Sequence, residues 1–532
     1  MAKQNGNGEK VKSMESWIWD AACSIRGAAD AAKYKDYILP LIFVKRLSDV
    51  FDDEIDRIAE KVKTRTKALQ LVERDKSLVR FYMPVRPKDP EMETTWDVIR
   101  TLSDKIGQQL TDILRSVAKE NTSLQGIIDR IDFNATTHGQ RDIDDDRLSK
   151  LIEKIAEKRL GLKDVEPDII GRSYEYLIRK FAEGSGQSAG EFYTPAEVGF
   201  IMAKIMDAEP GMEIYDPTCG SGGLLIKCEL VMEEKMQLNS KGLPNSAAGK
   251  YAPLKLYGQE FTPATWAMSK MNMVIHDMEG EIEIGDTLKT PKFRTKNNKK
   301  LRTFDRIVAN PMWNQGRDSL SYISDDFFIN DEMDRFPAGS CGGKIDWGWM
   351  QHIYSSLNDG GQAAIILDTG AASRGSGSQG NNKEKDCRKW FVVNDLIEGV
   401  IYLPENLFYN TSAPGIVIFL NKSKKHKGKI YLLHAGKEFE KGDPKNFITA
   451  DGIERIAGTY KKFKEEEKFS RFVNVDEIVK NDYNISPSRY IQITDAETYR
   501  PIGELVEELK TLEEEAIGID TELKTIFKKL GI

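Results

Sequence analysis

Cysteine is scarce in this sequence. The 532 residues include five cysteines and no CxxC pair: Cys23, Cys219, Cys228, Cys341 and Cys387. Disulfide frameworks and structural zinc sites require paired or clustered cysteines. We therefore expect reduced thiols and no metal site.

Long apolar runs are also missing. No stretch approaches the roughly 20 apolar residues of a membrane helix, and the first ten residues, MAKQNGNGEK, lack the apolar core of a signal peptide. We expect a cytoplasmic protein without membrane contact.

The third absence is an excess of basic residues. The 77 Lys and Arg against 84 Asp and Glu give a net charge of −7. Affinity for DNA comes mainly from Lys and Arg that neutralise phosphates, so this chain is not expected to hold a long stretch of DNA alone. Two local basic clusters, at 292–302 and 422–429, fit solvated loops and phosphate contacts equally well.

Apolar residues are abundant and periodic. They make up 40% of the chain, enough for sizeable cores, and the length predicts two or three structural units. Between residues 15 and 157 they recur at spacings of three and four. This spacing predicts an α-helical N-terminal domain over residues 1–165.

After residue 190 the pattern changes to short apolar runs that alternate with helical segments. The runs end at Asp216, Glu260, Asn310, Asp368, Pro404 and Asn421. Such alternation predicts an α/β domain over residues 166–490, with a mostly parallel sheet covered on both faces. Ligands of these sheets bind at the carboxyl ends of the strands. Segments 239–250 and 374–383, rich in Gly, Ser and Asn, are predicted to be mobile loops.

Residues 491–532 are predicted to form a C-terminal helical segment. An apolar stripe follows it through Leu505, Leu509, Leu512, Ile519, Leu523 and Ile526. The stripe fits packing on its own domain and packing on a partner helix equally well.

The first polar run end predicts a nucleotide-like ligand. Asp216 opens the sequence DPTCGSGG, in which Thr218, Gly220, Ser221, Gly222 and Gly223 follow, and a helical segment comes next. Glycines let a ligand approach the backbone. The spacing is not the GxGxxG of a dinucleotide site, so it favours a nucleoside ligand without pyrophosphate over a nicotinamide cofactor.

Two acids follow in order along the chain. Glu260 ends the next apolar run, where its carboxylate can accept both ribose hydroxyl protons. Asp286, one strand later, can accept from an adenine amine of the same ligand, although an acid after glycine is also an ordinary turn residue.

The sequence Asn310-Pro311-Met312-Trp313 predicts methyl transfer to the amine of a nucleic-acid base. The amine nitrogen of adenine is a poor nucleophile because its lone pair is delocalised into the ring. An Asn side-chain oxygen and the Pro carbonyl can each accept one amine hydrogen, which localises that lone pair for attack on a methyl sulfonium. Trp313 offers a stacking face for a base extruded from the duplex. The chemistry at a cytosine amine would be alike.

The chain resembles the modification (M) subunits of type I restriction-modification systems, within the DNA methyltransferases that act on amines. The resemblance rests on WDAACSIRGAADAAKYKDYILPLIFVKRLSD, EFYTP, DPTCGSGG, GQEFTPATWAMSKMNMVIHDM, GDTL, ANPMW, DWGWMQHIYSSLNDGGQAAII, LPENLFYNTSAPGIVIFLNK and DYNISPSRY. It implies a Rossmann-like methyltransferase domain, S-adenosylmethionine as cofactor and methylation of the adenine N6.

The resemblance also implies roles for particular residues. Those over the methionine end of the cofactor would be Glu191, Phe192, Tyr193, Thr194, Pro195 and Ala196. Ser221, Gly222 and Gly223 would line the cofactor turn, Glu260 would hold the ribose and Asp286 would face the cofactor adenine. Asn310, Pro311 and Trp313 would form the target-base site.

The resemblance implies partners as well: a specificity (S) subunit assembled with two M chains, a restriction (R) subunit, and double-stranded DNA. The C-terminal stripe then becomes an expected S-subunit contact.

The sequence departs from the family pattern at two places. Met312 stands where a second proline is usual, and Asp368-Thr369-Gly370 replaces a proline-containing turn. An alternative function is therefore a non-catalytic DNA-binding or assembly subunit that keeps the cofactor fold.

Overall fold

The computed structural model describes most of the chain. The described residues are 14–24, 35–84, 95–137, 139–165, 171, 173–177, 180, 194–239, 251–297, 299–316, 320–409, 411–443, 445–493, 506, 508–513, 515–516, 519, 523 and 527. Among them, no helix is long and apolar enough to cross a membrane.

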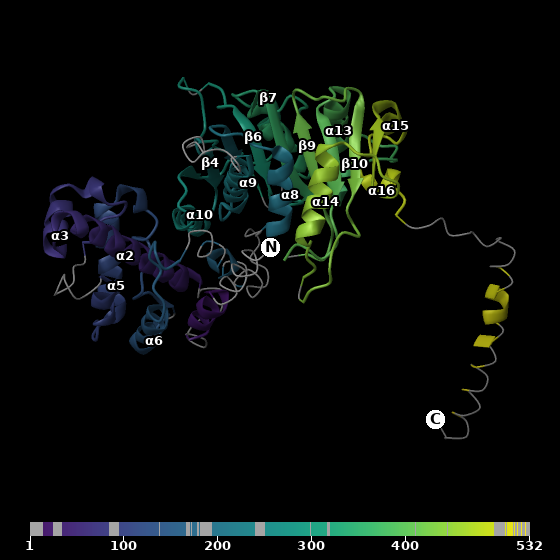
Figure 1. The fold of residues 1–532 in the computed structure, drawn as a ribbon. Coiled ribbons are helices and arrows are strands. Elements are labelled where there is room, and N and C mark those ends of the chain that lie inside the picture. Colours follow the sequence, from purple (N-terminus) through teal and green to yellow (C-terminus); the bar gives the residue numbers. More distant parts are fainter. Residues whose placement is uncertain are drawn as a thin grey trace.

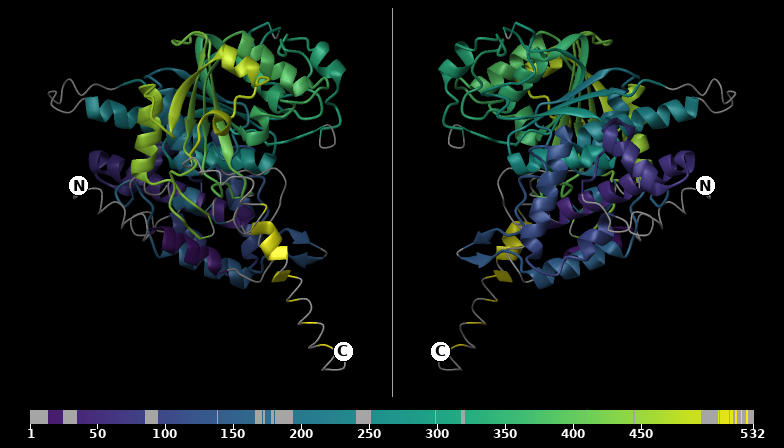
Figure 2. Two further views of the ribbon diagram at one scale, coloured as in Figure 1. Left: turned by 90° about the vertical axis from the view of Figure 1, so that its right-hand side faces the viewer. Right: turned by 90° about the vertical axis from the view of Figure 1, so that its left-hand side faces the viewer.

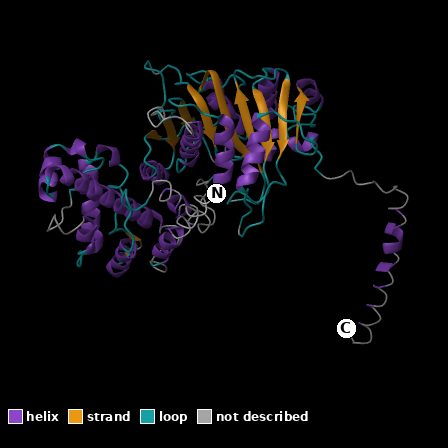
Figure 3. Cartoon of the chain, viewed as in Figure 1, coloured by secondary structure: helices purple, strands orange, loops and turns teal. Residues whose placement is uncertain are grey.

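The N-terminal part is helical, as the apolar spacing predicts (Figure 3). Residues 14–23 are helical, and the helices that follow are α2 (Lys35–Val62), α3 (Arg65–Arg74), α4 (Thr95–Arg100), α5 (Ile106–Glu120) and α6 (Asp145–Ala156). Short 3₁₀ turns η2 (Lys76–Leu78) and η3 (Thr122–Leu124) and a two-stranded sheet of β1 (Thr136–Thr137) and β2 (Gln140–Arg141) connect them.

A nine-stranded sheet forms the second part, in the order β11-β10-β8-β9-β7-β6-β3-β4-β5 (Figure 1). Its strands are β3 (Glu213–Asp216), β4 (Lys255–Glu260), β5 (Gly280–Ile284), β6 (Phe304–Ala309), β7 (Leu357–Asp368), β8 (Ile397–Tyr402), β9 (Gly415–Asn421), β10 (Lys429–His434) and β11 (Ser470–Asn474). Five of them, from β5 to β7, are mutually parallel, and β10 is parallel to β8. The predicted α/β fold with a mostly parallel sheet is confirmed.

Two strands run against their neighbours. β9 is antiparallel to both β7 and β8, and the edge strand β11 is antiparallel to β10. β9 is buried along its whole length, so its sequence GIVIFLN is a continuous apolar run like those of the parallel strands. Such a run predicts a buried strand but not its direction.

Helices cover both faces of the sheet. One face packs on α8 (Ala196–Met206), α9 (Gly223–Asn239) and α14 (Ala450–Lys461). The other packs on α11 (Asp325–Ile329), α12 (Asp346–Ser355), α13 (Lys383–Val393), α15 (Val475–Lys480) and α16 (Pro487–Tyr490). Successive strand residues alternate between the two cores, since Ile214 and Val308 face the first and Tyr215 and Ile307 the second.

Helix α10 (Pro263–Ile275) joins the two parts of the protein. Its residues Ala267, Met268 and Met271 belong to the same apolar core as the N-terminal helices, whereas Met273 packs in the core beside α9. The N-terminal helices consequently lie on the α10 side of the sheet domain (Figure 1; Figure 2 gives two further views).

A buried ion pair holds residues 173–177 against α9. Lys227 Nζ lies 3.1 Å from each carboxylate oxygen of Glu175 and 3.4 Å from the carbonyl oxygen of Gly223. The two side chains are 4% and 10% exposed, so water cannot replace a lost partner.

We expect Lys227→Met to lower the free energy of unfolding by about 3–5 kcal/mol, because it leaves the Glu175 carboxylate buried without its counter-ion. Lys204→Met is the matched control on α8, where both partners, Glu234 and Glu454, are largely exposed, and it should cost no more than about 1 kcal/mol. Urea denaturation of both variants measures the difference. Equal losses of unfolding free energy in the two variants would show that the buried pair stabilises the protein no more than the exposed one.

Candidate active site

The strand order reverses at β3. The chain runs from β3 to β4 and β5 on one side, while β6 pairs with the other side of β3. Loops that leave the carboxyl ends of β3 and β6 therefore diverge, and ligands of open α/β sheets bind at such a point. Asp216 ends β3 and Asn310 follows β6, so two polar residues predicted from sequence meet at this reversal point.

The turn after β3 is closed by its own hydrogen bonds and by β4. Asp216 Oδ1 accepts from the backbone N–H of Thr218 at 2.9 Å, and the N–H of Gly222 donates to Cys219 O at 2.8 Å. Gly220 and Gly222 have φ of 53° and 78°, values that favour glycine. Gly223 begins α9, so this turn places the backbone N–H groups of a helix start near the carboxyl end of β3.

Glu260 fastens the turn from the end of β4. One carboxylate oxygen accepts from the N–H of Gly220 at 3.0 Å, and the other accepts from the N–H of Thr262 at 2.8 Å. Its carboxylate thereby links the turn after β3 to the residue that precedes α10.

Asp216 is buried beside this acid. Burial raises its pKa to about 8, and the charge of Glu260 acts in the same direction. A negative charge is therefore less favourable on Asp216 than on a solvated carboxyl group.

Asp286 lies in the loop after β5 and has two partners. Its Oδ1 accepts from the N–H of Lys289 at 3.0 Å, as in an ordinary turn, and its Oδ2 accepts from the Tyr322 hydroxyl at 2.6 Å. The next residue, Thr287, donates its hydroxyl to Pro217 O at 2.6 Å. The loop with Asp286 is thus held directly against the turn after β3.

Asn310 is 8% exposed, and its amide has a defined orientation. The side-chain Nδ2 donates to Thr194 Oγ1 at 3.0 Å, and Oδ1 accepts from Trp313 Nε1 at 3.1 Å. One lone pair of Oδ1 is occupied by the indole and the other remains for a ligand.

The Trp313 ring packs on Phe408, with ring centroids 4.7 Å apart at 69°. Both rings lie close to β9, because a Cβ at Gly415 would stand 2.8 Å from Phe408 and 3.1 Å from Trp313. The orientation of Trp313 thus depends on Phe408 and on a glycine at position 415.

The structure brings most of the predicted site residues together. Asp216, Thr218, Gly220, Ser221, Gly222, Gly223, Glu260 and Asp286 form one group of adjoining loops, and Asn310, Pro311 and Trp313 lie at the neighbouring strand end. Thr194 contacts Asn310, and Pro195 and Ala196 form the start of α8. Glu191, Phe192 and Tyr193 lie outside the described residues.

Three aromatic residues at this site were not predicted from the sequence. Phe408 supports Trp313, Tyr322 donates to Asp286, and Phe261, directly after Glu260, exposes 69% of its surface. An aromatic residue directly after a run-ending acid was a usable signal for Phe261. Phe408 and Tyr322 are distant in sequence from their partners and give no local signal.

Two family models match the chain. Residues 165–498 match the N-6 DNA Methylase model, and residues 14–155 match the HsdM N-terminal domain model. The first match spans more than half of the 532 residues.

Relatives agree with these models. The type I restriction enzyme MjaIX methylase subunit of Methanocaldococcus jannaschii is 28% identical over 98% of this chain and 92% of its own length. The MpnII methylase subunit of Mycoplasma pneumoniae is 25% identical over 98% of both chains. The crystal structure of the type I restriction-modification methyltransferase subunit from Streptococcus thermophilus superposes with a TM-score of 0.72, at 26% identity, over 91% of this chain and all of its own. By sequence and by fold, this chain belongs to the N-6 DNA methylase family.

Proposed function

We propose that this N-6 DNA methylase takes its methyl group from S-adenosylmethionine and transfers it to an adenine N6 at the carboxyl ends of β3 and β6. The observation that carries this proposal is the orientation of Asn310, whose Oδ1 is directed by Trp313 while Nδ2 is held by Thr194.

The residues at the turn after β3 fit this cofactor. Gly220 and Gly222 provide a backbone that a nucleoside can approach, and Glu260 ends β4, where its carboxylate can accept from ribose hydroxyls. S-adenosylmethionine has no pyrophosphate, which agrees with the glycine spacing of this turn, since DPTCGSGG does not have the spacing GxGxxG. When bound, it supplies a methyl group on a positively charged sulfur.

Asn310 and Pro311 would act on the target base. The free lone pair of Asn310 Oδ1 and the carbonyl of Pro311 accept the two amine hydrogens, so the nitrogen lone pair is drawn out of the ring and becomes nucleophilic. As the nitrogen bonds to the methyl group, the methyl–sulfur bond would break and leave S-adenosylhomocysteine, and the methylated amine would lose one proton to water. The target adenine must leave the duplex to reach this site, and Trp313 is the predicted stacking surface.

We further propose that the chain works with an S subunit in a complex with two M chains, to which an R subunit can bind. Relatives named as type I methylase subunits and the net charge of −7 support this. So does the C-terminal stripe, because Leu509, Leu512, Ile519 and Leu523 are all exposed, at 58%, 55%, 60% and 41%. Leu505 and Ile526 lie outside the described residues.

We expect Asn310→Ala to reduce methyl transfer by roughly 10²–10³-fold, the scale for removing one group that stabilises the transition state. Cofactor affinity should remain, since Asn310 acts on the base. The assay follows labelled methyl groups into unmethylated DNA with and without the S subunit, and mapping of the product identifies the modified base. Asn394→Ala, at the exposed end of α13, is the control. A wild-type complex that binds cofactor but transfers nothing would instead support the non-catalytic alternative.

Glu260→Gln should weaken cofactor binding at least tenfold. Hydrogen bonds to a charged group contribute about 1.5–3 kcal/mol, and the amide has fewer acceptor sites than the carboxylate. Calorimetric titration with S-adenosylmethionine measures the effect, with the exposed Glu281→Gln on β5 as control. Equal affinity in both variants would remove Glu260 from the cofactor site.

Met312→Pro should leave turnover within about threefold of wild type. Among the described residues the backbone N–H of Met312 has no hydrogen-bond partner, so proline removes no such contact. A larger change in kcat, with cofactor affinity unchanged, would show that the φ of residue 312 affects residues 310–316, the loop after β6 that we call the target-base loop.

A further inference from the structure

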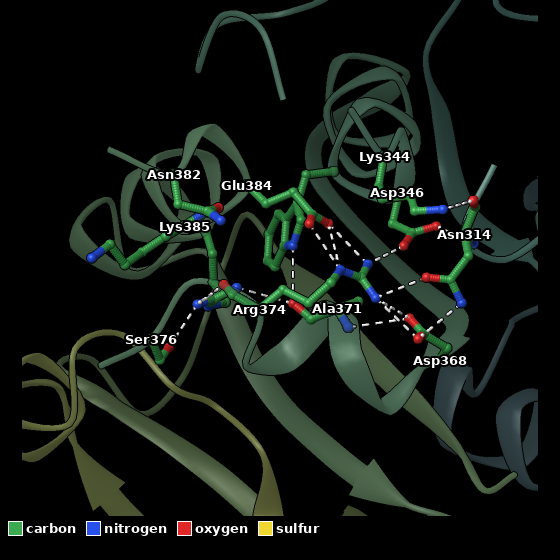
Figure 4. Close-up of polar contacts among 12 residues, drawn as sticks. Asn314, Lys344, Asp346, Asp368, Ala371, Arg374, Ser376, Asn382, Glu384 and Lys385 are labelled. Atoms are coloured by element: carbon green, nitrogen blue, oxygen red, sulfur yellow. Dashed lines mark hydrogen bonds and ion pairs between the residues drawn. The ribbon is translucent and has the colours of Figure 1, made fainter. Parts of the chain in front are cut away.

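Arg374 lies among three carboxylates beside the target-base loop. Its guanidinium donates to Asp346, to both oxygens of Asp368 at 2.9 and 3.0 Å, and to both oxygens of Glu384 at 2.8–3.0 Å (Figure 4). These acids come from the first turn of α12, the end of β7 and the first turn of α13. We call these four residues the Arg374 clamp.

The clamp holds Asn314, the residue directly after Trp313. Arg374 donates to Asn314 Oδ1 at 3.0 Å, and Asn314 Nδ2 donates to Asp368 Oδ2 at 3.0 Å. The backbone N–H of Asn314 donates to Asp346 Oδ1 at 3.1 Å. Lys344, outside the clamp, donates to the Asn314 carbonyl at 2.9 Å. Every polar group of Asn314 is therefore bonded to residues from outside its own loop.

The backbone of Asn314 is in the left-handed region, with φ of 57°. Asparagine tolerates this region better than most residues, and here the side-chain contacts select it. A left-handed residue at this point turns the chain sharply after Trp313. The position of Trp313, and through its Nε1 the orientation of Asn310 Oδ1, thus depends on how Asn314 is held.

Burial and the planar guanidinium make the clamp rigid. The Asp346 and Glu384 side chains are 0% and 8% exposed, and that of Arg374 is 24% exposed. A planar guanidinium that uses its fork on several carboxylates has a fixed orientation, which a lysine cannot reproduce. Ser376 and Arg388 hold the following backbone, since Arg388 donates to both Arg374 O and Ser376 Oγ.

We propose that the Arg374 clamp is a positioning device for methyl transfer: by fixing Asn314 it sets the geometry of the target-base residues Asn310 to Trp313. This role rests on the proposed function of that loop. Arg374 and Asn314 are positioning residues, since they act through Asn310 and Trp313. A displacement of about 1 Å at a reacting group can cost about 10²-fold in rate, so loosening this loop should be visible in kcat.

The decisive variant is Asn314→Gly. It keeps a backbone that accepts positive φ and leaves all ion pairs of the clamp in place, but it removes both side-chain contacts with Arg374 and Asp368. Asp334→Gly is the matched control, because Asp334 is an exposed non-glycine residue with φ of 54° that lies outside the clamp. Arg374→Lys is the second variant. Its control is Arg471→Lys on β11, which alters a single ion pair with Glu477 of α15.

Two measurements are made on each variant. Hydrogen exchange of the purified chain reports on the peptide covering residues 310–316, and methyl transfer by the complex with the S subunit gives kcat and the KM for S-adenosylmethionine. We expect at least tenfold faster exchange in this peptide for Asn314→Gly and Arg374→Lys, and a 10- to 100-fold lower kcat. The KM for the cofactor, the melting temperature of Asn314→Gly and both controls should stay near wild type.

The outcomes separate the two proposals. Unchanged exchange, or faster exchange with unchanged kcat, would overturn the positioning role while the proposed function stands. A wild-type complex without methyl transfer would overturn the proposed function, and faster exchange in the variants would then identify the clamp as a purely structural loop support. A loss of kcat accompanied by an equal rise in cofactor KM would also contradict the proposal.

Discussion

The pairing of β3 with β4 on one side and β6 on the other is the constraint on which the site depends. All three strands are parallel, so the residues after them emerge at one edge of the sheet, and the reversal of strand order separates their loops. Asp216, Glu260 and Asn310 are far apart in sequence but occupy adjoining strand ends. Their proximity thus follows from the strand order, and the side chains determine which ligand can bind there.

The parts of the fold that local pattern encodes were predictable. Apolar runs with polar ends gave the positions of β3, β4, β6, β7, β8 and β9, because a buried strand must be apolar along its length. The antiparallel direction of β9 was not predictable, since it depends on a connection that returns between two existing strands. β10 and β11 were not predicted, because KIYLLH begins inside the basic cluster 422–429 and SRFVN contains only two apolar residues. The domain boundaries at residues 165 and 490 stay predictions.

The site shows the same division between local and distant information. Asp216, Glu260 and Asn310 stand at strand ends and could be selected from sequence, whereas the contacts of Asn310 with Thr194 and of Trp313 with Phe408 join residues about a hundred positions apart. Segment 374–383 is the clearest case. Its Gly, Ser and Asn content predicts a mobile loop, yet its first residue, Arg374, bonds to three carboxylates that composition cannot reveal.

The two departures from the family pattern, Met312 and Asp368, are close in space. Asp368 contacts Asn314, two residues after Met312, and also accepts from Arg374. A proline at position 312 would limit the loop covalently, by fixing one φ angle. Here the conformational constraint acts two residues later and is non-covalent, because it depends on the side-chain contacts of Asn314. Because ion pairs and hydrogen bonds can open whereas a proline ring cannot, this arrangement makes the order of the loop after β6 depend on the charges around Arg374. A loop ordered by a second proline would not have this dependence.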